Sequence, residues 1–179
     1  MPEKTKEDFF KDGAGTRWFR TGDIGEIYDD GTLKIVDRKK DLVKLQYGEY
    51  VSLGKVESVL KTCPLVDNIC IYGESSKSFC VALLVPDRNK LTTLAEKNGI
   101  AADSFESVCA DKDITKVVLK ELCTHGRKAG LERFELPGAV TLCPELWTPE
   151  SGLVTAAFKL KRKPIQDYYN KDLKKMYTI

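Results

Sequence analysis

The sequence predicts an α+β fold, in which a short β-sheet and several helices form one mixed unit over residues 42–179, preceded by a β-meander over residues 17–36. Two observations predict the mixed unit. Short apolar runs rich in β-branched residues indicate strands, and between them apolar residues recur at the three- and four-residue spacing of a helix face. A third observation concerns the meander, whose three short strands have no core of their own. Because a small isolated sheet is only marginally stable in water, residues 1–36 are interpreted as the end of a larger domain.

The meander comes first in the chain. Its strands are expected at Trp18-Phe19, between Ile24 and Tyr28, and between Leu33 and Val36. Asp30-Gly31 supplies a tight turn between the last two strands. A dense charged cluster over residues 37–41 then separates the meander from the mixed unit.

The mixed unit opens with a short strand over residues 42–45. Ser52 is a favourable N-cap for a helix over residues 53–62, which the Cys63-Pro64 pair ends. Residues 68–72 and 79–85 are interpreted as paired central strands. The later elements are expected to be a helix over 88–98, a helix over 113–129, a strand over 138–143 and a helix from Pro164 with Ile165, Tyr168 or Tyr169, Leu173 and Met176 facing inward.

Composition excludes several classes of protein. The net charge is only +2, and no strand carries a basic and aromatic stripe, so nucleic acid is not expected as a partner. The first residues are too polar for a signal peptide, and no apolar run approaches the ~20 residues that span a bilayer. The six cysteines are scattered without a CxxC pair, which favours reduced, buried thiols in a cytosol-facing protein. We expect no metal site in the protein itself.

Four motifs identify a resemblance. Residues 18–25 (WFRTGDIG) and 35–44 (IVDRKKDLVK) resemble two adjacent core motifs of the adenylate-forming enzymes, which include the acyl-CoA synthetases and firefly luciferase. Residues 48–57 resemble the signature stretch of fatty acyl-CoA synthetases. Residues 147–162, which contain WTPESGLVT and FKLKR, are similar to the eukaryotic long-chain enzymes. Four motifs in the right order are a strong signal, and only residues 100–130 are undistinctive.

The resemblance implies the carboxyl-terminal part of a long-chain fatty acid–CoA ligase. Residues 1–36 would end the large AMP-binding domain, residues 37–41 would be a hinge, and residues 42–179 would be the small mobile domain. Such enzymes use ATP with Mg²⁺ to convert a long-chain fatty acid to acyl-AMP, and then transfer the acyl group to CoA. The family's phosphate loop and acyl tunnel lie in the large domain, which would be the chain's partner, so the isolated chain is expected to be inactive. The parent enzyme is expected on the endoplasmic reticulum or the mitochondrial outer membrane.

Three residues around the hinge match family positions. Asp23 matches the aspartate that binds the ribose hydroxyls, although after Thr-Gly it could equally cap a turn. Arg38 matches an arginine that contacts the ribose or the phosphates, and otherwise would be a solvated charge. Lys40 matches the residue about which the small domain rotates between the two half-reactions, where sequence alone predicts a surface charge.

Lys44 and Gly48 match the face that enters the active site during thioester formation. Gly48 would let the backbone approach the pantetheine arm of CoA closely, whereas the simpler interpretation is a strand end and a turn. The interval from Lys44 to Gly48 is one residue longer than in luciferase-like members, so the register of residues 45–47 is open by one position.

Lys159 matches the lysine of the adenylation step, which stabilises negative charge on the phosphate oxygens. Most members of the family have Gly before this lysine, and this chain has Phe158. Lys161 and Arg162 are competing candidates, because alternate residues of an extended segment share a face. The basic run could instead be a solvated patch or attract anionic lipid headgroups at a membrane surface.

The remaining alternatives concern single residues and the whole chain. His125, in a polar stretch, is expected at the surface, and Trp147 is expected to be a packing anchor. A non-catalytic interaction module derived from such an enzyme is the second hypothesis for the function.

Overall fold

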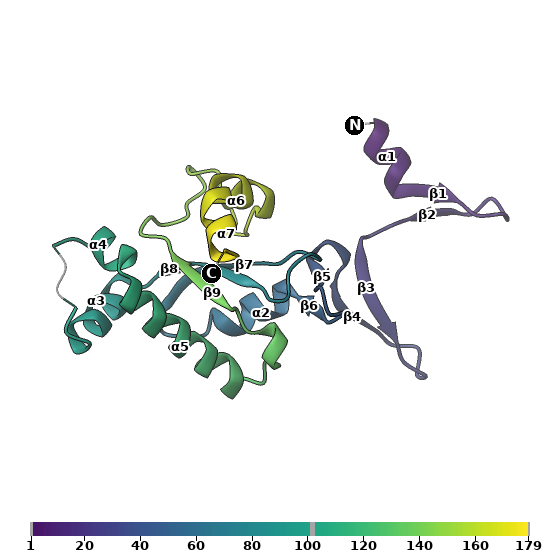
Figure 1. Ribbon diagram of the computed structural model, residues 1–179. Helices are drawn as coiled ribbons and strands as arrows, with labels where there is room; N and C mark the ends of the chain where they lie inside the picture. Colours follow the sequence, from purple (N-terminus) through teal and green to yellow (C-terminus); the bar gives the residue numbers. More distant parts are fainter. Residues whose placement is uncertain (1, 101–102, 179) are drawn as a thin grey trace. The chain divides into compact units, whose positions relative to one another are not determined.

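The computed structural model describes residues 2–100 and 103–178, which divide into two compact units, Met1–Leu42 and Val43–Ile179 (Figure 1). The division falls one residue after the segment 37–41. That segment contains the end of strand β4 (Leu33–Arg38) and the 3₁₀ turn η1 (Lys39–Asp41).

The first unit contains helix α1 (Pro2–Asp8) and two separate hairpins, so the prediction of a three-stranded meander was wrong. Strand β2 (Arg17–Phe19) pairs antiparallel with β1 (Phe9–Lys11), and not with β3 (Asp23–Ile27). The pairing depends on a local turn at Asp12, which the alternation of apolar and polar residues along the sequence does not reveal. The Asp12 carboxylate accepts hydrogen bonds from the backbone N–H groups of Ala14 and Thr16 and from the Trp18 indole, which closes the β1–β2 hairpin.

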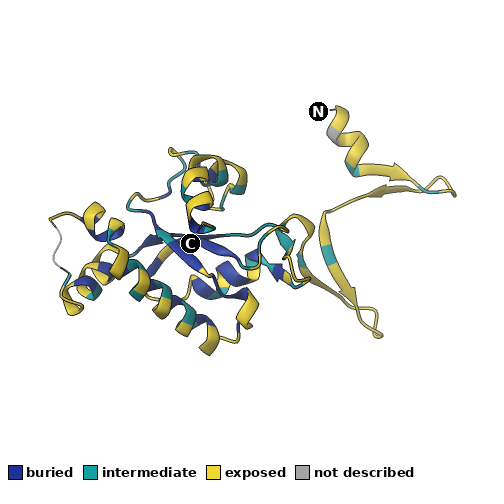
Figure 2. Cartoon of the chain, viewed as in Figure 1, coloured by how far each residue is buried: buried dark blue, intermediate teal, exposed yellow. Residues whose placement is uncertain are grey.

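The second hairpin pairs β3 antiparallel with β4. The predicted turn at Asp30-Gly31 is confirmed, with Gly31 in the left-handed region at φ 83° and the Asp30 carboxylate accepting from Thr32. Both hairpins carry large apolar side chains that are exposed (Figure 2). These side chains are Phe9, Phe10, Trp18, Phe19, Ile27, Tyr28, Leu33, Ile35 and Val36.

The second unit is built on a three-stranded sheet in the order β7 (Val66–Tyr72), β8 (Val81–Pro86) and β9 (Ala139–Leu142). Strand β8 is buried along its whole length, as a central strand covered on both faces would be. Strand β7 pairs antiparallel with β8, which confirms the predicted central pair, and β9 pairs parallel with β8.

Helices cover both faces of this sheet (Figure 1). Alternate residues of β8 point to opposite faces, so Ala82 and Leu84 pack with α2 (Leu53–Leu60) and α5 (Lys112–Lys128), whereas Val81 and Leu83 pack with the last two helices. Helices α3 (Arg88–Lys97) and α4 (Phe105–Ala110) complete the α2 and α5 side. Helix α4 was not predicted.

The expected single carboxyl-terminal helix is two helices, α6 (Arg162–Tyr168) and α7 (Asn170–Met176), with Tyr169 between them. Tyr169 is buried and Tyr168 is exposed, which decides between the two inward candidates. Helix α6 starts at Arg162, two residues before Pro164. Pro164 is tolerated in its first turn, because the backbone N–H groups there have no acceptor within the helix.

The remaining elements of the chain are short. Strands β5 (Leu42–Lys44) and β6 (Tyr50–Ser52) pair in a hairpin, and a second 3₁₀ turn, η2, covers Arg133–Glu135. Ser52 caps α2 as predicted, its hydroxyl accepting from the backbone N–H of Lys55 at 3.2 Å. All six cysteines are free thiols; five are buried as expected, whereas Cys123 is half-buried. In the described part of the chain, no helix combines the length and the apolar character that crossing a membrane requires.

Candidate functional site

Asp23 and Arg38 are brought together in the first unit. They are paired opposite each other at the open end of the β3–β4 hairpin, with Arg38 Nε 3.5 Å from Asp23 Oδ1. The Asp23 side chain keeps 30% of its surface exposed, so it can still accept further hydrogen bonds. Gly22, at φ 77°, accepts a backbone hydrogen bond from Lys39 and so ties the preceding turn to η1. A carboxylate and a guanidinium side by side suit a ligand that offers both hydroxyls and an anionic group.

Lys40 is exposed within η1, a single 3₁₀ turn between the extended residues Arg38 and Leu42. A short helical turn between two extended residues, at the division between compact units, is the kind of segment that can absorb a change in backbone angles. Its role as a pivot stays a prediction.

Lys44 and Gly48 lie on the β5–β6 hairpin of the second unit. Gly48 has φ 98°, and a Cβ built there would meet no atom within 4 Å, so the backbone is open to solvent at this point. The backbone of Leu45 closes the turn, donating to Glu49 O at 2.8 Å and accepting from Gly48 N at 3.0 Å. Lys44 Nζ lies 5.5 Å from the centroid of the Tyr50 ring, which leaves the ammonium at an exposed aromatic surface.

Lys159 is exposed at a tight hairpin, defined here as residues 153–161. Val154 and Leu160 form an antiparallel bridge, and Thr155 N–H donates to Lys159 O at 2.8 Å. The Thr155 hydroxyl accepts from Lys159 N–H at 3.1 Å. Lys161 N–H donates to Leu153 O at 2.9 Å and closes the base of this hairpin.

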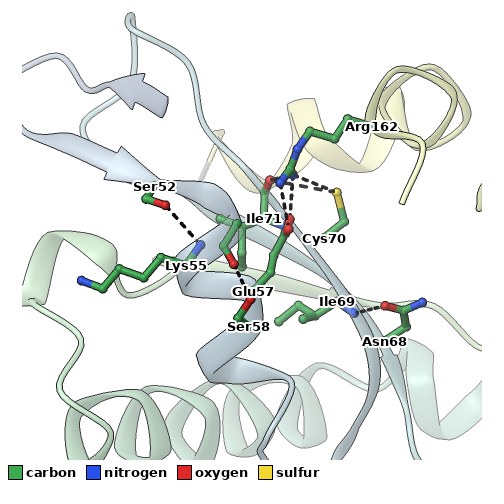
Figure 3. A network of polar contacts seen from close by, with 10 residues as sticks. Ser52, Lys55, Glu57, Ser58, Asn68, Ile69, Cys70, Ile71 and Arg162 are labelled. Carbon is green, nitrogen blue, oxygen red and sulfur yellow. Dashed lines mark hydrogen bonds and ion pairs between the residues drawn. The ribbon is translucent and has the colours of Figure 1, made fainter. Parts of the chain in front are cut away.

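Arg162 is held at the base of the hairpin by an ion pair (Figure 3). Its two terminal nitrogens donate to the two carboxylate oxygens of Glu57 at 2.7 and 2.8 Å. The side chains keep only 20% and 11% of their surface exposed. Because Glu57 engages both terminal nitrogens of Arg162, the structure favours a structural role for this residue over contact with a phosphate. Lys159 and Lys161 remain candidates for the lysine of the adenylation step, since both side chains are exposed.

Comparison with known proteins identifies relatives of this chain. The chain is 50% identical over 176 residues to long chain acyl-CoA synthetase 8 of Arabidopsis thaliana, covering 98% of this chain and 24% of the relative. It is 44% identical over 178 residues to long-chain-fatty-acid–CoA ligase 1 of Schizosaccharomyces pombe, covering 98% of this chain and 26% of the relative. The homologues of this chain are long-chain acyl-CoA synthetases. It spans about a quarter of the length of these relatives.

A solved structure extends the family likeness to the fold. The chain superposes on the adenylation domain of a carboxylic acid reductase from Segniliparus rugosus, solved with AMP and a co-purified carboxylic acid, with a TM-score of 0.80 at 28% identity. The match covers 99% of this chain and 25% of that chain. The region matched is the carboxyl-terminal part of the adenylate-forming fold, as the motifs predicted. No family model matches the chain.

Phe158 stands where most adenylate-forming enzymes have Gly, and its backbone conformation is one that favours Gly. It is the one non-glycine residue with positive φ in the described ranges 2–100 and 103–178, at φ 55°. The family's usual Gly meets no steric penalty in that region, whereas Phe does. The hairpin keeps its shape at Phe158, with Phe158 N–H donating to Thr155 O at 2.8 Å.

Sequence reasoning missed the Glu57–Arg162 pair and expected His125 at the surface. His125 is half-buried, and its Nε2 lies 2.8 Å from the Thr62 hydroxyl. Trp147 is buried and donates to the Tyr169 hydroxyl at 3.1 Å, which confirms it as a packing anchor. No cluster of His, Cys, Asp and Glu that could hold a metal ion occurs among the residues described.

Proposed function

We propose that this chain supplies the end of the large domain, the hinge and the mobile domain of a long-chain fatty acid–CoA ligase. The observation that carries the proposal is the distribution of matched residues over two compact units. Asp23 and Arg38 form a pair on the first unit, and Lys159 is exposed at a braced hairpin on the second. The 50% identity to a long chain acyl-CoA synthetase over nearly the whole chain supports the same function.

In the adenylation step, a fatty carboxylate attacks the α-phosphate of ATP and pyrophosphate leaves. Asp23 would accept hydrogen bonds from the ribose hydroxyls, and Arg38 would contact the ribose or the phosphates. Lys159 would stabilise the charge that builds up on the phosphate oxygens, because its side chain is exposed beside the tip of a hydrogen-bonded hairpin. The Mg²⁺ that travels with ATP would neutralise further phosphate charge.

In the second step, the CoA thiolate attacks the acyl carbonyl and AMP leaves. A rotation about Lys40 would replace the Lys159 hairpin by the face that bears Lys44 and Gly48. The open backbone at Gly48 favours close passage of the pantetheine arm, since no side chain fills the space there.

The rest of the enzyme is the proposed partner of this chain. The two hairpins of the first unit leave apolar side chains exposed, such as Trp18 and Ile35, at 52% and 57%. Exposed apolar surface of this extent is typical of an interface. Since the relatives are about four times longer, we predict that the 179 residues alone form no acyl-CoA.

A peripheral membrane contact of the basic carboxyl-terminal run is the finer part of the proposal. Arg162 pairs with Glu57 and Lys163 Nζ pairs with Asp167 at 2.7 Å, so the lipid attraction would rest mainly on Lys159 and Lys161. Location of the parent on the endoplasmic reticulum or the mitochondrial outer membrane belongs to the same proposal.

The test replaces the matching quarter of the Arabidopsis relative by this chain and measures acyl-CoA formed from ATP, CoA and a long-chain fatty acid. We expect activity that depends on the grafted chain. Lys159→Ala should lower the rate by about 100-fold or more, as loss of a charge-stabilising donor does. Lys161→Ala is the matched control and should stay within a few-fold of the wild type.

Two results would contradict the proposal. A correctly folded chimera without activity would favour the alternative, a non-catalytic interaction module. An active chimera in which Lys161→Ala is severe and Lys159→Ala is mild would exchange the roles of the two lysines.

A further inference from the structure

We propose that Glu57 and Arg162 act as a positioning pair that fixes the base of the 153–161 hairpin and so aims Lys159 for the adenylation step. The proposal rests on the proposed function for the chemistry of Lys159. It adds two residues that touch no reacting atom, and whose effect is specific to one of the two half-reactions.

The geometry of the pair is that of a planar fork on a carboxylate. Arg162 donates from both terminal nitrogens to the two Glu57 oxygens, and one of these nitrogens also lies 3.3 Å from Ile71 O. Glu57 Oε1 accepts from the Ile71 backbone N–H at 2.8 Å as well. The pair therefore joins helix α2, strand β7 and the start of helix α6 at one point (Figure 3). Bidentate pairs of this kind fix direction as well as distance.

The connection from this point to Lys159 is short and hydrogen-bonded. Arg162 directly follows Lys161, whose backbone N–H closes the hairpin on Leu153 O. The next residue towards Lys159, Leu160, forms the antiparallel bridge with Val154. Lys159 follows, and two hydrogen bonds join it to Thr155 on the opposite side of the hairpin. A shift of Arg162 would move the hairpin base, because the neighbouring residue Lys161 closes that base through its backbone hydrogen bond to Leu153. Displacement of about 1 Å can cost on the order of 100-fold in rate.

The pair is poorly explained as a surface charge interaction. Both side chains are mostly buried, and Cys70 Sγ lies 3.9 Å from the guanidinium, so the surroundings are partly apolar. A buried charge pair often adds little stability compared with apolar residues of similar size. Lysine cannot donate two parallel hydrogen bonds to one carboxylate as the guanidinium does. Arg162→Lys therefore keeps the positive charge but loses the fixed orientation of the pair.

The first experiment separates the two half-reactions in the chimera with the Arabidopsis relative. Arg162→Lys should lower the rate of acyl-adenylate formation by about 10- to 100-fold. The rate of thioester formation from supplied acyl-adenylate and CoA should stay within about threefold, because that step uses the face with Lys44 and Gly48. Lys163→Ala, which removes the neighbouring exposed ion pair with Asp167, is the matched control and should leave both rates unchanged. Equal losses in both half-reactions, or no loss in either, would overturn the proposal.

The second experiment needs no activity and uses the 179-residue chain. Hydrogen exchange of the Lys161 and Thr155 amides should become at least about tenfold faster in Arg162→Lys and in Glu57→Gln, while the amides of β8 keep their protection. Unchanged exchange at both hairpin amides would refute the positioning role. An inactive wild-type chimera would refute the proposed function instead, and this measurement would still decide whether the pair holds the hairpin.

Discussion

Phe158 adopts a left-handed backbone conformation that is unfavourable for a non-glycine residue. A left-handed conformation costs a non-glycine residue about 1–2 kcal/mol, and the loss of chain entropy that glycine suffers on folding offsets about half of the gain from replacing it. The Phe158 side chain is 62% exposed, so little packing is lost with it. We expect Phe158→Gly to raise the free energy of unfolding by about 0.5–1 kcal/mol, measured by urea denaturation.

Phe158→Ala is the control, since alanine keeps the steric penalty and removes the ring. Its stability should not rise. If the alanine variant gained as much as the glycine variant, the exposed ring and not the backbone would be the source of the strain.

The buried thiol of Cys80 makes the free energy of unfolding depend on pH in the alkaline range. Burial raises the pKa of this thiol from its ordinary value of 9.0 to about 12. Above pH 9 the unfolded chain loses the proton while the folded chain keeps it, so the folded state binds more protons and stability falls as pH rises towards 12. The slope contributed by this thiol is about 1.4 kcal/mol per pH unit.

The comparison that isolates this contribution uses Cys80→Ala in reducing buffer. Its unfolding free energy should decline less steeply between pH 10 and 11 than that of the wild type. Parallel curves for the two proteins would mean that the thiol does not keep its proton in the folded state.

At the scale of elements, sequence spacing located α2, α3 and α5 to within about two residues, because their buried side chains follow the period of a helix. Helix α4 has six residues, too few for a period to emerge. The β1–β2 pairing was missed because the Asp12 side chain decides it, and a carboxylate accepting three hydrogen bonds is not visible in an alternation of apolar residues. That turn could have been suspected from the Asp-Gly pair at 12–13.

The candidate site divides in the same way. Motifs led to Asp23, Arg38, Lys44, Gly48 and Lys159, and the structure pairs the first two on one hairpin. The Glu57–Arg162 contact joins residues 105 positions apart, so nothing local in the sequence predicts it. Arg162 consequently looked like one more member of a basic run.

The start of α5 offers a test at this scale. Asp111 caps the helix, its Oδ1 accepting from the backbone N–H groups of Asp113 and Ile114 at 2.8 and 2.9 Å. Asp111→Ala should lower the free energy of unfolding by about 1 kcal/mol, since two donors of the first turn lose their acceptor. Asp113→Asn, which removes an exposed ion pair with Lys116, is the control and should change stability little at moderate salt. Equal losses in both variants would argue that helix charge and not capping is responsible.

At the scale of the whole molecule, the chain consists of two compact units with Leu42 and Val43 at the division. The second unit has a continuous core on both faces of its sheet, whereas the first unit leaves most of its apolar side chains exposed. That contrast would suit the proposed arrangement, in which the second unit is a mobile domain and the hairpins of the first unit are part of a larger domain. The proposed mechanism depends on such motion, because Lys159 and Gly48 would serve different half-reactions at one active site.

The most direct measurement compares Lys159→Ala with Gly48→Val in the chimera, timing acyl-adenylate formation and CoA transfer separately. The account predicts opposite losses: adenylation falls by about 100-fold in the lysine variant while transfer from supplied acyl-adenylate persists, and the valine variant shows the reverse. If both variants lost the same half-reaction, or each lost both equally, one moving domain would not be presenting two separate faces to the substrate.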